Sequence, residues 1–79
     1  MFYAYRQHAH LSVAGTHREL QLHQFASQAE RDAFVNATPG ASVTRAGDIP
    51  ARHMSLFREF GGTRRPDGGF WGVVDSGTS

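Results

Sequence analysis

The first 25 residues contain two stretches in which side chains alternate between two sides, as they do along β-strands. Residues 2–11 alternate loosely and are rich in aromatic side chains. Residues 17–25 alternate again, with Leu20 and Leu22 opposite polar neighbours. A glycine-bearing turn at residues 12–16 separates the two stretches. We therefore expect a β-hairpin at the start of the chain.

The pattern then changes to helical spacing. Ser27 and Glu30 match a capping box. In this motif the serine side chain accepts a hydrogen bond from the backbone amide of the glutamate, and the glutamate side chain accepts one from the backbone amide of the serine. A stripe of mostly small side chains recurs at three- and four-residue steps: Ala26, Ala29, Ala33, Phe34 and Ala37. We expect a helix that lies close to a sheet through this stripe and ends at residues 38–40.

The clearest periodicity in the chain predicts a second helix. Asp48 is the expected N-cap, with Pro50 in the first turn and Gly61-Gly62 as the stop. Its apolar face comprises Ile49, His53, Leu56, Phe57 and Phe60. The short β-prone run at residues 41–46 predicts a strand between the two helices.

Turn residues at 63–69 precede a last predicted strand at residues 70–74, and we expect residues 75–79 to be a frayed tail. The predicted order is ββαβαβ. The expected fold class is α+β, a small antiparallel sheet with both helices packed on one face. Residues 1–74 would form a single domain.

Composition narrows the functional classes. A chain of 79 residues has room for one core, and a net charge of +1 argues against both a strongly cationic nucleic-acid coat and an acidic DNA mimic. Cysteine is absent, which excludes disulfides and thiolate chemistry. No stretch has the roughly 20 apolar residues of a membrane helix, and the first residues lack the layout of a signal peptide. We expect a cytoplasmic protein without membrane contact.

Histidine is the residue type that suggests a metal. His8 and His10 would share a strand face, and His17 or His23 from the paired strand is the third ligand that a catalytic zinc would need. Solvated strand histidines explain the same pattern and are the favoured interpretation, so no metal site is predicted. We expect His53, on the apolar stripe, to be a hydrogen-bonded core residue.

Enzyme motifs do not emerge from the sequence. No serine lies in a strand-to-helix elbow, and no carboxylate pair has a recognisable context. The glycine pairs do not form a phosphate loop, because no helix follows them and the chain has no lysine. We expect a non-catalytic protein without a cofactor.

The most informative surface segment is Arg64-Arg65-Pro66-Asp67-Gly68-Gly69-Phe70-Trp71, where two guanidinium groups stand beside two large aromatic side chains. Arg and Trp are frequent hot spots of interfaces. Neighbours on a strand face opposite sides, so the two aromatic side chains point away from each other, and Trp71 would mark a contact site if it faces water. The predicted partner-binding residues are Arg64, Arg65, Phe70 and Trp71, with Tyr3, Tyr5 and Arg6 behind them. The alternative is that the aromatics only close the core while the arginines stay solvated.

A second functional class remains open. A sheet face that carries aromatics and arginine would stack single-stranded bases, which describes a small nucleic-acid-binding module, although a charge of +1 gives such binding little electrostatic support. A homodimer is also open, because nine aromatic residues (six Phe, two Tyr and one Trp) are many for so small a core to bury.

Residues 24–48 resemble a segment of small orphan proteins from phages and mobile elements, some of which are anti-CRISPR proteins. The matching positions are Phe25, Ser27, Glu30, Arg31, Asp32, Phe34, Val35, Thr44 and Arg45. The resemblance implies a structural role for Ser27, Glu30 and Phe34 and assigns no binding residue. The segment could also serve as a scaffold in other phage proteins. Our leading hypothesis is an anti-CRISPR inhibitor that would bind a type I CRISPR surveillance complex in the bacterial host cytosol and block DNA binding or recruitment of the helicase-nuclease.

Overall fold

The computed structural model describes residues 1–13, 15–59, 62–66 and 68–78. The elements in chain order are β1 (Phe2–Ser12), β2 (Gly15–Phe25), α1 (Gln28–Ala37), β3 (Ala41–Thr44), the 3-10 turn η1 (Ala46–Asp48), α2 (Ala51–Glu59), β4 (Thr63–Arg64) and β5 (Phe70–Thr78). The predicted α+β class is confirmed, and the two-residue strand β4 is an addition to the expected order. Phe60, Gly61 and Asp67, which the sequence placed at the end of the second helix and in the last turn, lie outside the described residues.

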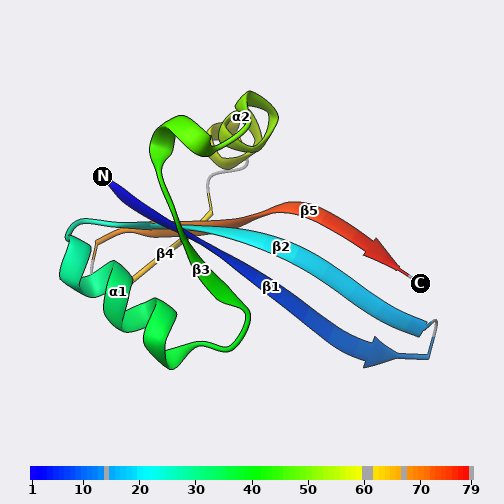
Figure 1. The fold of residues 1–79 in the computed structure, drawn as a ribbon. Coiled ribbons are helices and arrows are strands. Elements are labelled where there is room, and N and C mark those ends of the chain that lie inside the picture. The colour runs from blue at the N-terminus through cyan, green and yellow to red at the C-terminus, as the bar shows by residue number, and fades with distance from the viewer. Residues whose placement is uncertain (14, 60–61, 67, 79) are drawn as a thin grey trace.

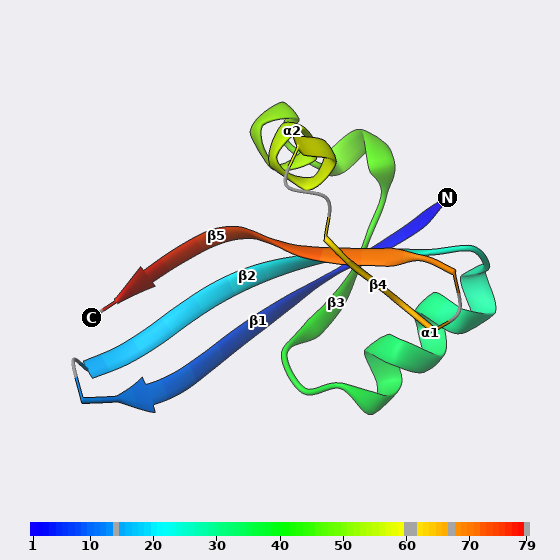
Figure 2. The ribbon, with the colours of Figure 1, turned by 180° about the vertical axis from the view of Figure 1, so that it is seen from behind.

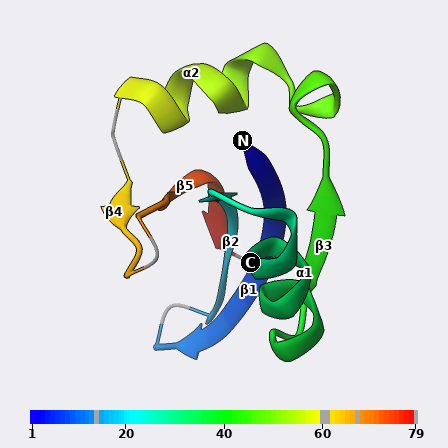
Figure 3. The same cartoon turned by 90° about the vertical axis from the view of Figure 1, so that its left-hand side faces the viewer.

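The sheet has five antiparallel strands in the order β3-β1-β2-β5-β4. The predicted hairpin is its centre, with β1 and β2 paired from Phe2 with Phe25 to Ser12 with Gly15. β3 and β4 are short strands at opposite edges of the sheet, as the end-on view shows (Figure 3). The long central strands therefore extend well beyond both of their outer neighbours.

The two helices lie on opposite faces of the sheet, α2 above it and α1 below it (Figure 1). The expectation of both helices on one face is therefore wrong. The reason is in the central strand β2, where Leu22 is fully buried in the core beneath α2, and the fully buried Phe25 contacts Phe34 of α1 on the other face. Because both faces of β2 carry large apolar side chains, each face needs its own cover.

Helix α1 begins as predicted, since the Ser27 hydroxyl oxygen accepts a 3.2 Å hydrogen bond from the Glu30 amide. The packed face is not the predicted alanine stripe. Ala26, Ala29, Ala33 and Ala37 are all exposed. The half-buried Phe34 faces the sheet instead, and the Arg31 guanidinium lies over the Phe2 ring at 5.5 Å. The large side chains, which bury more area, determine the rotation of the helix.

Helix α2 starts at Ala51, three residues after the predicted cap. Asp48 closes the preceding turn η1, and Ile49 is extended with φ −82° and ψ 122°. Proline disfavours helical geometry in the residue before it, so the helix begins only after Pro50. The Pro50 carbonyl accepts a hydrogen bond from the Met54 amide. Two residues of the predicted apolar face of this helix, His53 and Phe57, are buried as expected.

The predicted frayed tail is wrong for residues 75–78, which are part of the sheet, and Ser79 lies outside the described residues. Residues 75–78 continue β5 and pair with residues 17–20 of β2, with a bulge between Leu20 and Gln21. Val74, which falls in that irregular step, is buried in the core beneath α2. Pairing with a long central strand thus orders a polar segment that has no apolar pattern of its own.

The far ends of β1, β2 and β5 form a three-stranded arm that projects past both helices (Figures 1 and 2). Neither helix covers the arm, and Leu11 near its tip is 83% exposed. The helices themselves are short. In the part of the chain that the structure describes, none has the length and apolar character to cross a membrane.

Candidate functional site

Arg65 is the centre of an aromatic cluster on the α1 face of the sheet. Its backbone is fixed by a turn in which the Arg65 amide donates a hydrogen bond to the Gly69 carbonyl and the Arg65 carbonyl accepts one from the Gly68 amide. Its guanidinium lies 4.2 Å from the ring centre of Phe25 and 4.9 Å from that of Phe34. Each contact is a cation–π interaction, which gains strength when the cation is shielded from water.

The same guanidinium orients a buried histidine. Arg65 Nη1 donates a 2.7 Å hydrogen bond to His23 Nδ1, and because a guanidinium only donates, Nδ1 must accept. The ring proton is therefore on His23 Nε2, which donates to Gln21 Oε1 at 2.9 Å. The Gln21 amide donates in turn to Glu19 at 2.9 Å. Alternate residues of β2 thus form one directed hydrogen-bond chain from Arg65 to Glu19.

His23 is held neutral in this setting. Burial, which is the largest cause, and the positive charges of Arg65 and Arg6 together lower the pKa of its imidazole to about 4. A neutral ring is also what the hydrogen-bond pattern requires, since a protonated Nδ1 cannot accept from Arg65. The site is therefore a fixed structural network at neutral pH.

Trp71 completes the cluster by stacking on His23, with ring centres 5.5 Å apart and planes 11° from parallel. It is half-buried. Its neighbour Phe70 faces the other way and is 40% exposed. Phe70 is the cross-strand partner of Arg64, which is also exposed. The predicted segment therefore divides into a supporting pair, Arg65 and Trp71, and an outer pair, Arg64 and Phe70.

The residues predicted to lie behind this segment do not form one surface. Tyr3 and Tyr5 pack against the core on the α2 face. Arg6 lies on the opposite face, where its Nη2 donates to His8 Nδ1 at 3.3 Å. Within the described residues, Arg6 Nε is the buried side-chain polar atom without a hydrogen-bond partner.

Tyr5 belongs to a second histidine network. Arg52 Nη2 donates to His53 Nε2 at 3.2 Å, so the other ring nitrogen, Nδ1, carries the proton and donates to the Tyr5 hydroxyl at 2.9 Å. Burial raises the pKa of that hydroxyl. His53 is the hydrogen-bonded core histidine that the sequence predicted.

The remaining histidines stand together on the arm. His10 is the cross-strand partner of His17, with ring centres 4.9 Å apart, and the ring of His8 is 5.4 Å from that of His10. His23, a third ligand considered from the sequence, is occupied by Arg65. Within the described ranges, no group of three or more potential ligands is placed to hold a metal ion.

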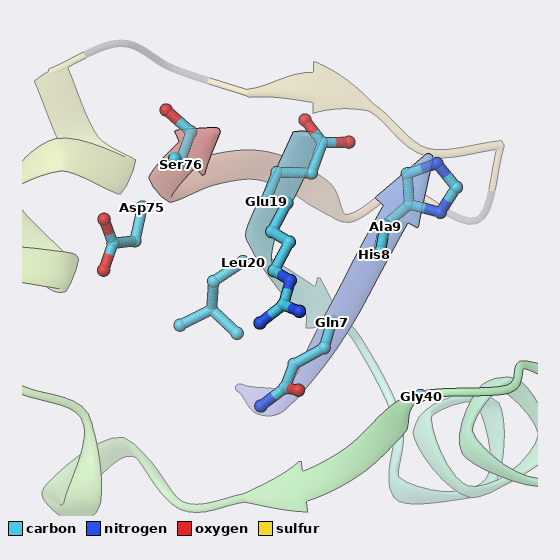
Figure 4. Close-up of a pocket in the computed structure, with 10 residues that line it drawn as sticks. Gln7, His8, Ala9, Glu19, Leu20, Gly40, Asp75 and Ser76 are labelled. Atoms are coloured by element: carbon cyan, nitrogen blue, oxygen red, sulfur yellow. The ribbon is translucent and has the colours of Figure 1, made fainter. Parts of the chain in front are cut away.

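A shallow hollow of about 680 Å³ lies along the arm. Gln7, Leu20 and Asp75 point to one side of the three strands there, and His8 and Glu19 point to the other (Figure 4). The polar lining is spread over three strands and does not converge on one point. This arrangement resembles an open sheet surface more than an enclosed substrate site.

Part of this site was missed in the sequence. Glu19, Gln21 and His23 do recur at every second position, which places them on one strand face, but nothing in the sequence pairs them with a residue 42 positions away. Comparison of the chain with protein-family models, curated proteins and solved structures gives no match.

Proposed function

We propose that this chain is a non-catalytic protein that acts by covering a surface of a partner protein, with Arg64 and Phe70 as the centre of the contact. The observation that supports the proposal is their cross-strand pairing at the β4 edge, where both side chains are exposed. An aromatic ring that fills a pocket beside a guanidinium that pairs with a carboxylate is a common composition of interface hot spots.

The support beneath this pair favours the proposal. The next residues along each strand, Arg65 and Trp71, are fixed by stacking and by the short bond to His23. A contact displayed on a rigid base loses less conformational entropy on binding. Arg65 and Trp71 thus act as positioning residues, while Arg64 and Phe70 touch the partner.

Within this class, the proposed partner is a subunit of a type I CRISPR surveillance complex, as the resemblance of residues 24–48 suggests. Binding would block the DNA path or the docking site of the helicase-nuclease. A standard interface needs about 800 Å² from each partner, a modest share of the 5049 Å² that this chain exposes. At a net charge of +1, contact through arginines and aromatics fits better than imitation of DNA.

The nucleic-acid-binding alternative loses support from the same geometry. Trp71, Arg65 and Tyr5, which would have offered stacking surfaces, make their contacts within the protein. The alternative predicts tight binding to DNA or RNA that weakens steeply with salt, which a mobility-shift series measures. That result would replace the present proposal.

The direct experiment measures binding of the purified chain to purified type I surveillance complexes by biolayer interferometry. Arg64→Glu and Phe70→Ala should each weaken binding at least about tenfold. Val43→Ala is the matched control, since Val43 is 50% exposed on the opposite edge of the sheet. Loss of binding with the control variant as well, or no effect of Arg64→Glu and Phe70→Ala, would contradict the assignment of the contact. No binding to any such complex would remove this partner.

A further inference from the structure

The outer edge of β1 is only half covered. β3 pairs with it from Tyr3 to Arg6, and the Gln7 amide donates to the Gly40 carbonyl at 2.9 Å. Beyond Gln7, residues 8–12 pair with β2 on one side and, in the described part of the chain, with no strand on the other. An exposed strand edge of this kind is a template for another strand.

The hydrogen bond of Gln7 fixes which backbone groups are available. In an antiparallel ladder, every second residue directs its N–H and C=O to the same neighbour. Since the backbone N–H of Gln7 is directed toward β3, the backbone groups of Ala9 and Leu11 are directed to the same side, beyond the start of β3. The backbone groups of His8 and His10 are directed toward β2. Ala9 and Leu11 therefore carry the open backbone groups of this edge.

We infer that a second copy of this chain adds its own β1 to this edge, antiparallel, with the twofold axis passing through His10. His10 is the middle of the open segment 8–12. Two such segments overlap over their whole length only when the axis lies at their middle. Ala9 of each copy then pairs with Leu11 of the other, which satisfies the open groups of both.

The paired segments end before the part of the edge that is already covered. In this register, Ser12 of the second copy stands opposite His8, one residue before Gln7, whose amide is bonded to Gly40. β3 and the incoming strand would follow one another along the same edge of β1.

The side chains of the segment also fit a self-pairing. A twofold axis places a residue against its own copy, so any fixed charge there would repel itself. Residues 8–12 contain no Asp, Glu, Lys or Arg. The side chains of Ala9 and Leu11 lie on the face of the strand opposite to His8 and His10. There Leu11, which is 83% exposed, would be covered in part by Ala9 and Leu11 of the second copy.

The open edge of β5 is a poorer candidate. β4 pairs with β5 only at Phe70 and Trp71, so the later part of β5 is also uncovered in the described structure. A bulge interrupts its regular spacing, and Asp75 lies near the middle of the open part. Bulges and charges on edge strands are the devices by which proteins prevent such pairing.

This dimer is independent of the proposed partner contact. Arg64 and Phe70 belong to the β4 edge, and the His10 axis lies on the other side of the sheet, beyond β1. Both copies would keep their outer pairs exposed, so the dimer would present two equal contacts. Failure of either proposal leaves the other intact.

Sedimentation equilibrium of the full chain at pH 8, from about 10 to 500 μM, is the first test. A pairing of one short strand per copy is small for an interface, so the mass should rise with concentration from 8.7 kDa toward twice that value. A constant monomer mass over this range would overturn the inference.

The position of the axis has a sharper test. His10→Glu and His10→Lys should each raise the dimer dissociation constant at least about tenfold at low salt, because each places like charges against each other. An equimolar mixture of the two variants should dimerise again, since Glu would then face Lys. If both variants dimerise as well as the parent, or if the mixture stays monomeric, His10 is not on the axis.

Two further variants separate the edges. Ala9→Pro removes the outward N–H but none of the bonds between β1 and β2, so it should abolish the dimer while circular dichroism stays unchanged. Val73→Glu places a charge on the open edge of β5, where Val73 is 44% exposed, and should leave the dimer unaffected. A dimer that survives Ala9→Pro, or that is lost with Val73→Glu, would contradict the β1 pairing.

Discussion

Arg65 Nη1 donates a 2.7 Å hydrogen bond to His23 Nδ1, which joins the turn after β4 to the C-terminal part of β2. The two residues are 42 positions apart, and their contact connects the edge of the sheet to its central strand. The Arg65 guanidinium is held in place by aromatic rings, because it contacts Phe25 and Phe34. Trp71 stacks on His23, the histidine that Arg65 orients. This contact supports the outer pair of Arg64 and Phe70.

Arg65→Ala should lower the free energy of unfolding by about 2–3 kcal/mol, because it removes two cation–π contacts and leaves His23 Nδ1 without a donor. Urea unfolding at pH 7.5 measures the difference. Arg64→Ala is the matched control, and the exposed position of Arg64 predicts a change within about 0.5 kcal/mol. Equal effects of the two substitutions would contradict the supporting role of Arg65.

His23 makes stability depend on pH in a defined window. The unfolded imidazole titrates near 6.5 and the folded one has a pKa of about 4, so between these values the unfolded chain binds the additional proton. The contribution of His23 is therefore complete above pH 6.5 and is lost as pH falls toward 4. Its upper bound is about 3 kcal/mol. The measurement is the stability difference between the parent chain and His23→Gln from pH 8 to pH 4, which should shrink over this window; a constant difference would contradict a depressed pKa.

Tyr5→Phe should cost about 1 kcal/mol of stability, because the buried His53 Nδ1–H loses its acceptor. Tyr3→Phe is the comparison, since the Tyr3 hydroxyl donates to Gln24 over a longer 3.4 Å contact. We expect the Tyr3 change to cost distinctly less in thermal unfolding. A larger loss for Tyr3 would contradict the greater contribution of the Tyr5–His53 hydrogen bond.

Gly40 joins α1 to β3 at a position that only glycine adopts readily. Its φ is +80°, and a Cβ there would stand 2.5 Å from the Gln7 carbonyl oxygen. Gly40→Ala should lower stability by more than about 1 kcal/mol. Gly47→Ala, where a Cβ would have nothing within 4 Å, should change stability little in the same urea titration. A tolerated Gly40→Ala would mean that this turn is held less tightly than the Gln7–Gly40 bond implies.

The local elements of this fold were predictable because their causes are local. Alternation along residues 2–25 predicted the hairpin, and Ser27 predicted the start of α1 to the residue. The start of α2 was predictable in principle, since Pro50 fixes the conformation of Ile49. Asp48 is a favoured residue type for a helix cap, but Pro50 restricts the backbone before it more strongly and so determines where α2 begins.

The arrangement in space depended on interactions that the sequence does not display. β5 extends to Thr78 only because β2 is long enough to pair with it. The helices cover opposite faces because β2 carries large apolar side chains on both. Among the predicted contact residues, alternation correctly separated Phe70 from Trp71, but no pattern indicated that Arg65 would pack among aromatic rings while Arg64 stays exposed.

Photo-crosslinking from position 70 in a living bacterial host tests the central claim most directly. A photoreactive phenylalanine in place of Phe70 keeps the aromatic character of the exposed position, and the same residue at Val43, on the opposite edge, is the control. The proposed function predicts one discrete crosslinked host protein from position 70, a CRISPR effector subunit, and none from position 43. Crosslinks to nucleic acid, equal products from both positions, or no product from position 70 would contradict it.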